Sequence, residues 1–153
     1  MKKPSKRRSG DQPTPKPKPV RPVPPDQRVG VSDVVLVRAK GTPGKGAGPG
    51  GEAWSIVTKG VKSGRIFINW IDEPPVGPHA SIQIYLNRQS QGRGIGRIAY
   101  RLASEDSQYP TIFAHMRKSN EPSKRAAQAA GYQDATPPDY TQHLMRWDRQ
   151  QSL

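Results

Sequence analysis

The stretch "NRQSQGRGIGRIAYRLASEDS", Asn87 to Ser107, combines three glycines and four arginines with the beginning of a helical pattern. Four apolar residues after Gly94 recur at the spacing of one helix face: Ile95, Ile98, Ala99 and Leu102. A helix N-terminus presents free amide N–H groups, and glycines before it let an anion approach the backbone closely. Arg93 and Arg97 add charge that can pair with phosphate oxygens. The stretch predicts a phosphate-binding turn; the alternative is a tight strand-to-helix turn with solvated arginines.

Short apolar and β-branched runs on both sides of this stretch predict strands. The expected strands cover residues 33–39, 53–58, 65–71, 79–86, 111–116 and 140–147, and the second and third form an antiparallel hairpin. A second helix is expected over 120–133, because Pro122 lies near its start and Gly131 near its end. The Gly/Pro-rich segment 40–52 is expected to be a loop. This order of elements indicates an α/β or α+β fold with a mixed sheet.

Length and composition indicate one folded domain preceded by a basic tail. The 153 residues suffice for a single core, so residues 31–153 are expected to form one domain. Residues 1–30 contain nine Lys/Arg, two Asp and eight of the 17 prolines, without an apolar pattern, and are expected to be disordered. The tail is either a solubilising extension or a contact for nucleic acid or another polyanion.

Several classes of protein are disfavoured by what the sequence lacks. It contains no cysteine, which excludes disulfides, thiolate metal sites and a cysteine nucleophile. Its three histidines, His79, His115 and His143, stand far apart in sequence, so no metal site is expected. The chain shows neither a secretory signal nor an apolar run approaching the roughly 18 residues of a membrane span. A soluble, cytoplasmic protein without a membrane partner is expected.

Two linked motifs resemble the GNAT superfamily of acyl-CoA-dependent N-acyltransferases. Gln91-Gly92-Arg93-Gly94-Ile95-Gly96 is similar to the superfamily's Gln/Arg-x-x-Gly-x-Gly/Ala signature between a strand and a helix. "NEPSKRAAQAAGY", from Asn120 to Tyr132, is similar to its asparagine, alanine-rich helix and terminal Gly-Phe/Tyr. The resemblance covers residues 53–147. It implies a mixed, mostly antiparallel sheet of about six strands flanked by helices. The superfamily usually places two helices between its first two strands, but only the loop 40–52 stands there in this chain, so a reduced first helical region is expected.

The resemblance also implies acetyl-CoA as the cosubstrate and assigns residues to it. The strand ending at Ile84, Tyr85 and Leu86 would separate from the next strand, so that its main-chain groups bond the pantetheine arm. Asn120 would bond the same arm near its thiol end. The residues implied to hold the pyrophosphate are Gln91, Gly92, Arg93, Gly94, Ile95, Gly96 and Arg97.

The resemblance leaves the catalytic groups less determined. Some members of the superfamily carry a glutamate base five residues before the asparagine, where this chain has His115. A histidine suits the task because it titrates near neutral pH. Glu73 is the second candidate base and His79 the third, and a water chain is another alternative. In many members a tyrosine seven residues after the asparagine protonates the leaving thiolate. That position is Ala127 in this chain, so Tyr85, Tyr140 or water would have to donate the proton.

The function that these inferences imply is an N-acetyltransferase that moves an acetyl group from acetyl-CoA to a primary amine. Without a cysteine, direct attack of the amine in a ternary complex is expected, with a main-chain amide near Leu86 holding the oxyanion. Because the first helical region is reduced, the acceptor side is expected to be open or covered by a mobile loop. The alternatives are a non-catalytic CoA-binding relative and a nucleic-acid-associated basic binding protein.

Overall fold

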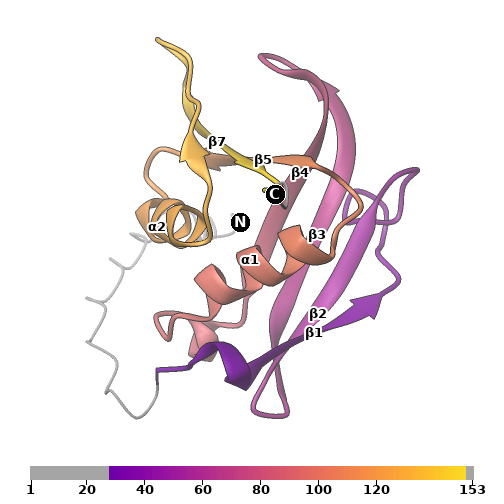
Figure 1. Ribbon diagram of the computed structural model, residues 1–153, viewed down its shortest axis with the longest axis vertical. Helices are drawn as coiled ribbons and strands as arrows, with labels where there is room; N and C mark the ends of the chain where they lie inside the picture. Colours follow the sequence, from indigo (N-terminus) through magenta and orange to yellow (C-terminus); the bar gives the residue numbers. More distant parts are fainter. Residues whose placement is uncertain (1–27, 151–153) are drawn as a thin grey trace, which may run out of the picture.

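A computed structural model describes residues 28–150 of the chain and shows the expected α+β class. Its mixed sheet has the order β1-β2-β3-β4-β5-β7-β6. The strands are β1 (Val34–Ala39), β2 (Glu52–Thr58), β3 (Val61–Glu73), β4 (Gly77–Leu86), β5 (Thr111–Arg117), β6 (Gln133–Asp134) and β7 (Gln142–Asp148). The helices are α1 (Ile95–Asp106) and α2 (Glu121–Ala129), with short 3₁₀ turns at Val31–Asp33 and Arg88–Ser90. Figure 1 shows α1 lying across the sheet, with α2 near β5 and β7.

The central hairpin is longer than the sequence pattern predicts. β3 and β4 pair without interruption from Gly64↔Leu86 to Glu73↔Gly77. The segment 72–78, which separates two of the expected strands, is therefore mostly strand with a tight turn, and Gly77 takes the positive φ of 89° that the turn requires. This hairpin forms the middle of the sheet and carries the expected strand residues Ile84, Tyr85 and Leu86 at its end.

Two details of the C-terminal half differ from the expectation. β6 adds a seventh strand of only two residues, which pair with Arg146 and Met145 of β7. The second helix ends at Ala129, earlier than expected, because Gly131 takes a left-handed φ of 103° and the Tyr132 N–H turns back to donate to the Ala127 carbonyl.

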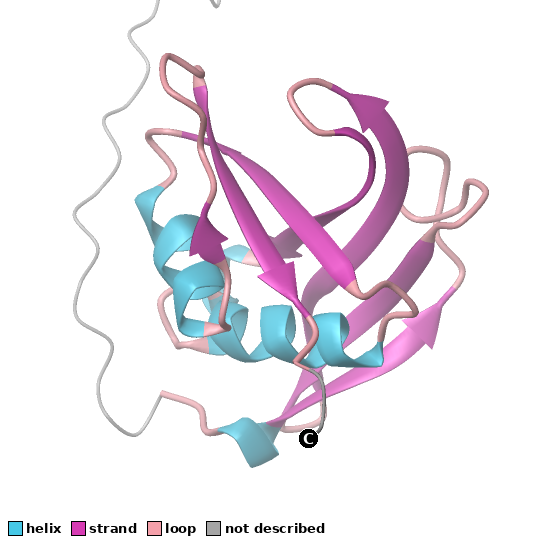
Figure 2. Cartoon of the chain, turned by 45° about the horizontal axis from the view of Figure 1, so that its top comes forward, coloured by secondary structure: helices cyan, strands magenta, loops and turns pink. Residues whose placement is uncertain are grey.

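Both helices pack on the same face of the sheet, as Figure 2 shows. The core lies between this face and the helices and includes Trp54, Ile66, Ile82, Ala99 and Ala114, none more than 1% exposed. Strand alternation places Phe67, His79 and His115 on the opposite face, which no helix between residues 28 and 150 covers. The sheet thus has a helix-covered face and an open face.

The sheet separates between β4 and β5. This is the one parallel pair of strands in the described range, and its register contains only Ala80↔Ile112 and Ser81↔Phe113. Beyond Ser81 the two strands diverge, so residues 82–86 have no partner in β5. The separation that the resemblance implies is therefore present, and main-chain groups of β4 are left available at its widest part.

The Gly/Pro-rich segment between β1 and β2 contains no helix, as expected, but it is tied to the sheet rather than loose. The Gly46 N–H donates to Asn69 Oδ1, and Asn69 Nδ2 donates to the Gly44 carbonyl, both at 2.8 Å. The Tyr109 hydroxyl donates to the Gly50 carbonyl at 2.5 Å. These bonds fix the loop along the part of β3 that extends beyond β2.

The N-terminal boundary also differs from the expectation. Residues 1–27, most of the expected tail, lie outside the described residues. Val29, however, is only 4% exposed and belongs to the core. Its N–H donates to the Arg93 carbonyl, so the packed structure begins before residue 31. None of the helices between residues 28 and 150 combines the length and apolar character that a membrane crossing requires.

Candidate functional site

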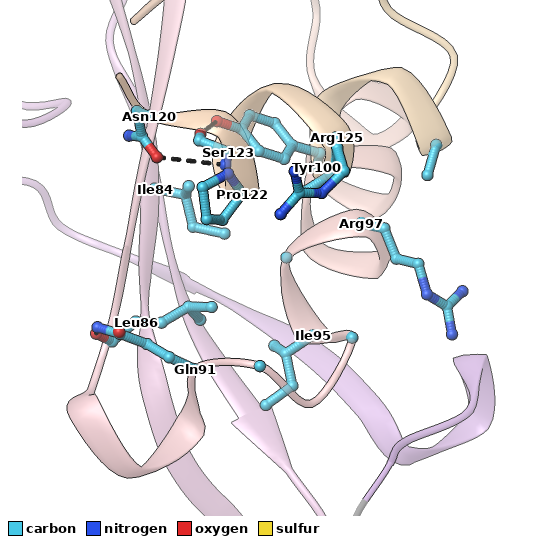
Figure 3. Close-up of a pocket in the computed structure, with 15 residues that line it drawn as sticks. Ile84, Leu86, Gln91, Ile95, Arg97, Tyr100, Asn120, Pro122, Ser123 and Arg125 are labelled. Carbon is cyan, nitrogen blue, oxygen red and sulfur yellow. Dashed lines mark hydrogen bonds between the residues drawn. The ribbon is translucent and has the colours of Figure 1, made fainter. Parts of the chain in front are cut away.

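A cavity of about 620 Å³ opens between the end of β4, the turn before α1, and α2. Figure 3 shows the side chains that converge on it from these elements. Its lining contains most of the residues that the two sequence motifs predict as cofactor-binding. The lining residues are Ile84, Leu86, Gln91, Gly92, Gly94, Ile95, Gly96, Arg97, Tyr100, Asn120, Pro122, Ser123, Arg125, Ala126 and Ala129. Arg93 and the Tyr85 side chain are the predicted cofactor residues that do not line it.

The glycines of the first motif serve two different purposes. Gly92 and Gly94 have φ angles of 77° and 85°, a conformation that side-chain-bearing residues rarely adopt. Gly94 is the N-cap of α1 and supplies no side-chain acceptor, so the first-turn N–H groups have no capping side chain. Gly96 lies inside the helix, where an added Cβ would come within 3.3 Å of the Ala126 Cβ. It allows α1 and α2 to pack closely beside the cavity.

Arg93 and Arg97 both contact Val29. The Arg97 guanidinium turns away from the α2 side of the cavity (Figure 3) and donates to the Val29 carbonyl at 3.3 Å. Arg93 contributes its main-chain carbonyl to the bond from Val29. Arg125 of α2 extends toward the cavity in Figure 3 and was not anticipated from the sequence. Because Arg125 lies within the second motif, residues 120–132, the sequence could have indicated it as a cavity residue.

Asn120 caps the second helix at the cavity. Its Oδ1 accepts a hydrogen bond from the Ser123 N–H at 3.3 Å, and Pro122 occupies the first turn of α2. The N-termini of α1 and α2 therefore both border the same cavity. Two such ends favour an anionic or amide-rich ligand, because their free N–H groups and dipoles add.

A tyrosine that the sequence interpretation missed lies at the Asn120 end of the cavity. The Tyr100 hydroxyl is 2.8 Å from Ser123 Oγ, and the tyrosine is only 2% exposed (Figure 3). Burial raises the pKa of Tyr100 above its usual value, although the hydrogen bond with Ser123 acts in the opposite direction. Ala127, the position of the missing tyrosine, is completely buried one helical turn after Ser123. Tyr100 therefore places a hydroxyl beside Ser123, one turn of α2 before the position where other members carry the tyrosine.

The end of β4 contributes main chain to the cavity side and a ring to the open face. The Leu86 carbonyl accepts a hydrogen bond from Gln91 Nε2 at 3.3 Å, whereas Ile84 lines the cavity with its side chain. Tyr85 points to the open face, where it is 51% exposed and stacks on the buried Phe67 with ring centroids 6.0 Å apart.

The structure brings two of the candidate bases together. His79 Nδ1 lies 2.6 Å from the Gly77 carbonyl oxygen, which can only accept, so Nδ1 carries a proton. His79 Nε2 lies 2.8 Å from His115 Nε2. With His79 neutral, its Nε2 accepts and His115 Nε2–H donates, which leaves the lone pair of His115 on Nδ1. The pair stands on the open face beside the separation of β4 and β5.

The surroundings of His115 favour its neutral form. Burial lowers the pKa of His115 below its usual range, and His79 lowers it further, while the Glu73 carboxylate opposes both effects.

The other candidate catalytic residues lie outside the cavity. Glu73 is exposed at the end of β3 and lines no part of the cavity. Tyr140 donates weakly, at 3.4 Å, to the Pro74 carbonyl in the β3–β4 turn and is also outside the cavity. In residues 28–150 no group of three or more acidic or histidine side chains is placed to hold a metal ion.

Comparison with known proteins relates the fold to acetyltransferases. No family model matches the sequence, and no curated protein does. Among solved structures, RimJ of Mycobacterium smegmatis in complex with CoA-disulfide has a TM-score of 0.51 at 19% identity, covering 64% of this chain and 53% of that one. A GNAT-family acetyltransferase from Streptococcus agalactiae has a TM-score of 0.56 at 15% identity, covering 65% and 66%. The aminoglycoside acetyltransferase AAC(6')-Ib, solved with coenzyme A and kanamycin, has a TM-score of 0.53 at 19% identity, covering 65% and 67%.

These likenesses show that the chain has the GNAT fold, as the two motifs indicate. At 15 to 19% identity they show the fold alone, and the chain spans only about half to two thirds of the length of these three structures.

Proposed function

We propose that this protein is an acetyl-CoA-dependent N-acetyltransferase that acts on a primary amine by direct attack in a ternary complex. The observation that carries the proposal is the cavity where two helix N-termini and the unpaired end of β4 meet. Phosphates suit the helix ends, and an amide-bearing arm suits the free main chain of β4. Bound acetyl-CoA would supply the acetyl thioester.

The cavity residues divide into two groups in this proposal. The first-turn amides of α1, together with Gly92 and Gly94, bind the pyrophosphate, and Arg125 adds positive charge. The main-chain groups of Ile84, Tyr85 and Leu86 and the Asn120 side chain bind the pantetheine arm. An amide near Leu86 stabilises the oxyanion that develops during attack.

On the open face, His115 accepts the proton of the attacking amine at Nδ1. Its lowered pKa keeps this atom unprotonated at neutral pH. His79 acts as a positioning residue, because its protonated Nδ1 and its contact with His115 Nε2 set the tautomer of the base. Glu73 remains the second candidate base.

Tyr100 donates a proton to the leaving thiolate on the cavity side. Its raised pKa keeps the hydroxyl protonated through the neutral range, and Ser123 orients it. It replaces Tyr85 and Tyr140 as the favoured donor, because it lines the cavity whereas the side chains of the other two do not.

The direct test is acetyl-CoA binding by calorimetry, followed by thiol release with a panel of amines. Substitution at Gly94 would strain its positive φ, so Ala129→Glu is the better probe: it adds a negative charge at the cavity on an exposed helical position. We expect affinity to fall at least about tenfold, or roughly 1.4 kcal/mol.

Gln128→Glu is the matched control, because it adds the same charge on the same helix outside the cavity. Absence of acetyl-CoA binding at millimolar concentration would contradict the proposal altogether. Binding without thiol release for any amine would instead favour a non-catalytic CoA-binding protein.

A further inference from the structure

A positively charged surface surrounds Tyr85 on the open face. Lys45 Nζ lies 5.8 Å from the centroid of the Tyr85 ring, and Arg65 Cζ lies 5.9 Å from it. Arg65 is the cross-strand partner of Tyr85, while Lys45 comes from the Gly-rich loop. The anchor residue Asn69 bonds to Gly44 and Gly46, the two neighbours of Lys45, and so holds the lysine in place. We call Lys45, Arg65, Tyr85 and Arg117 the basic surface.

The cations of this surface have no carboxylate partner in residues 28–150. The structure shows no ion pair for Lys45, Arg65 or Arg117 in that range. Most nearby acidic side chains are paired with other arginines: Glu52 and Asp106 with Arg38 on the helix-covered side, and Asp148 with Arg146. Glu73 is the carboxylate that acts on His115, and within the described range it forms no ion pair with the three cations. The surface is therefore positive, in agreement with the excess of basic residues in the chain.

The basic surface adjoins the proposed base. Strand alternation puts Tyr85 on the same face as His79, and Arg117 on the same face as His115. Because β4 and β5 diverge after Ser81↔Phe113, Tyr85 and Arg117 stand on opposite sides of the separation. The cations therefore lie on the same face of the sheet as His115, on both sides of the separation.

The chemistry of this surface selects among acceptor amines. Polycationic amines, such as polyamines and aminoglycosides, are repelled by Lys45, Arg65 and Arg117. Nucleic acids suit the charge, but the amino groups of their bases are conjugated and weakly nucleophilic. The class of acceptor that suits both the charge and the reaction is an aliphatic primary amine on an anionic carrier. The surface extends over β3, β4 and β5, at least about 10 Å, which exceeds the reach of a single amino acid.

We propose that the acceptor is the primary amine of an acidic peptide segment, whose carboxylates bind the basic surface while the amine reaches His115. This inference rests on the proposed function. The amine attacks the acetyl carbon, the C–S bond breaks, and the amine proton passes to His115 while the thiolate is protonated from the cavity side.

The test compares three peptides of equal length, each with a blocked N-terminus and one central lysine flanked by Glu, Gln or Lys. Free glutamate, spermidine and kanamycin complete the panel, with product identified by mass. We expect kcat/KM for the Glu peptide to exceed that for the Gln peptide at least about tenfold, and the difference to shrink with added salt. Preference for the Gln or Lys peptide, free glutamate, spermidine or kanamycin would overturn the inference.

Two variants connect the preference to the surface. Lys45→Gln combined with Arg65→Gln should remove most of the preference for the Glu peptide while acetyl-CoA affinity is retained. Arg101→Gln, on the exposed side of α1, makes the same kind of change away from the open face and should retain the preference. A preference that survives the double substitution would contradict the role of this surface.

Binding of a fluorescent Glu peptide, measured by anisotropy, separates this inference from the proposed function. Salt-sensitive binding without any thiol release would mean that the surface is assigned correctly and the activity is not. Thiol release with other amines but no binding of the Glu peptide would mean that the activity is assigned correctly and the surface is not. Displacement of the Glu peptide by an oligonucleotide that binds more than tenfold tighter would identify nucleic acid as the occupant and overturn the peptide assignment.

Discussion

Two buried tyrosines allow the role of the Tyr100 hydroxyl to be separated from its structural contribution. Tyr100 and Tyr132 each bond to a serine hydroxyl, Ser123 and Ser104, but only Tyr100 lines the cavity. Replacement by phenylalanine should cost each about 1 kcal/mol of unfolding free energy. Tyr100→Phe should also lower kcat about a hundredfold with acetyl-CoA affinity unchanged, whereas Tyr132→Phe should leave kcat near normal. Equal kcat values in both variants would assign the proton to water or to Tyr85 or Tyr140.

The lowered pKa of His115 predicts the acidic side of the pH profile. Neutral His115 is the active form, and its folded-state pKa lies below the usual value near 6.5, so activity should persist on acidification and fall only below that pH. His115→Gln should lower turnover by about two to four orders of magnitude and remove this limb. His79→Gln removes one cause of the lowering, so the limb should move to higher pH.

His143 provides the control for these substitutions. His143 Nε2 lies 3.6 Å from Glu121 Oε2, and the residue does not line the cavity. His143→Gln should therefore leave the acidic limb of the pH profile in place. If His115→Gln retains both turnover and the limb, the base lies elsewhere, and Glu73→Gln is the next variant to measure.

At the scale of elements, the contact between α1 and α2 depends on Gly96. A Cβ at this position would meet the Ala126 Cβ at 3.3 Å, so Gly96→Ala should displace the helices that form the cavity. We expect weaker acetyl-CoA binding in Gly96→Ala and recovery in the double variant with Ala126→Gly, measured by calorimetry. The unfolding free energy need not recover, since glycine costs a helix about 1 kcal/mol. Continued weak binding in the double variant would mean that Gly96 contacts the ligand itself.

The Gly-rich loop makes a second prediction at this scale. Asn69→Ala removes both side-chain hydrogen bonds that hold the segment around Lys45. It should therefore reduce the preference for the Glu peptide, in the same direction as the double substitution of Lys45 and Arg65, without changing acetyl-CoA affinity. Asn87→Ala, which removes a side-chain bond to the Lys62 carbonyl at the other end of β3, is the matched control.

Elements with a long periodic pattern could be predicted from the sequence, whereas short or non-local features could not. The spacing of Ile95, Ile98 and Leu102 predicts α1, and the alternation of apolar and polar residues in 79–86 predicts β4 and its two faces. β6 was missed because two residues carry no periodicity and pair only through β7. The contact of His79 with His115 joins residues 36 positions apart, and it depends on how the parallel strands lie together.

The same distinction applies to the candidate site. The motifs around Gln91 and Asn120 predict most of the cavity, because each is a local strand-to-helix or helix-start signal. Tyr100 was missed because its position in α1 is also consistent with simple packing, and its partner Ser123 lies on another helix. Arg97 was expected at the phosphate and lines the cavity. Its bond to Val29 was not anticipated, because the sequence pattern assigned Val29 to the tail.

On the scale of the whole molecule, the basic N-terminal segment and the domain meet at Val29. Val29 is buried, its N–H donates to the Arg93 carbonyl at 3.1 Å, and its carbonyl accepts from Arg97. A chain that begins at residue 28 keeps these contacts, whereas one that begins at residue 31 loses them. This pair of truncations therefore separates the charge of the first 27 residues from the support that Val29 gives to the turn before α1.

The chain that begins at residue 28 should retain its melting temperature and acetyl-CoA affinity, because every described contact of the domain remains. It should lose salt-sensitive binding to polyanions, since it lacks eight of the 25 Lys/Arg residues. The chain that begins at residue 31 should melt on the order of 5–10 °C lower, as burial of a valine contributes about 2 kcal/mol, and should bind acetyl-CoA more weakly. Identical melting and binding in the two truncations would show that Val29 supports neither the core nor the turn, and loss of acetyl-CoA binding in the longer one would place residues 1–27 at the cavity.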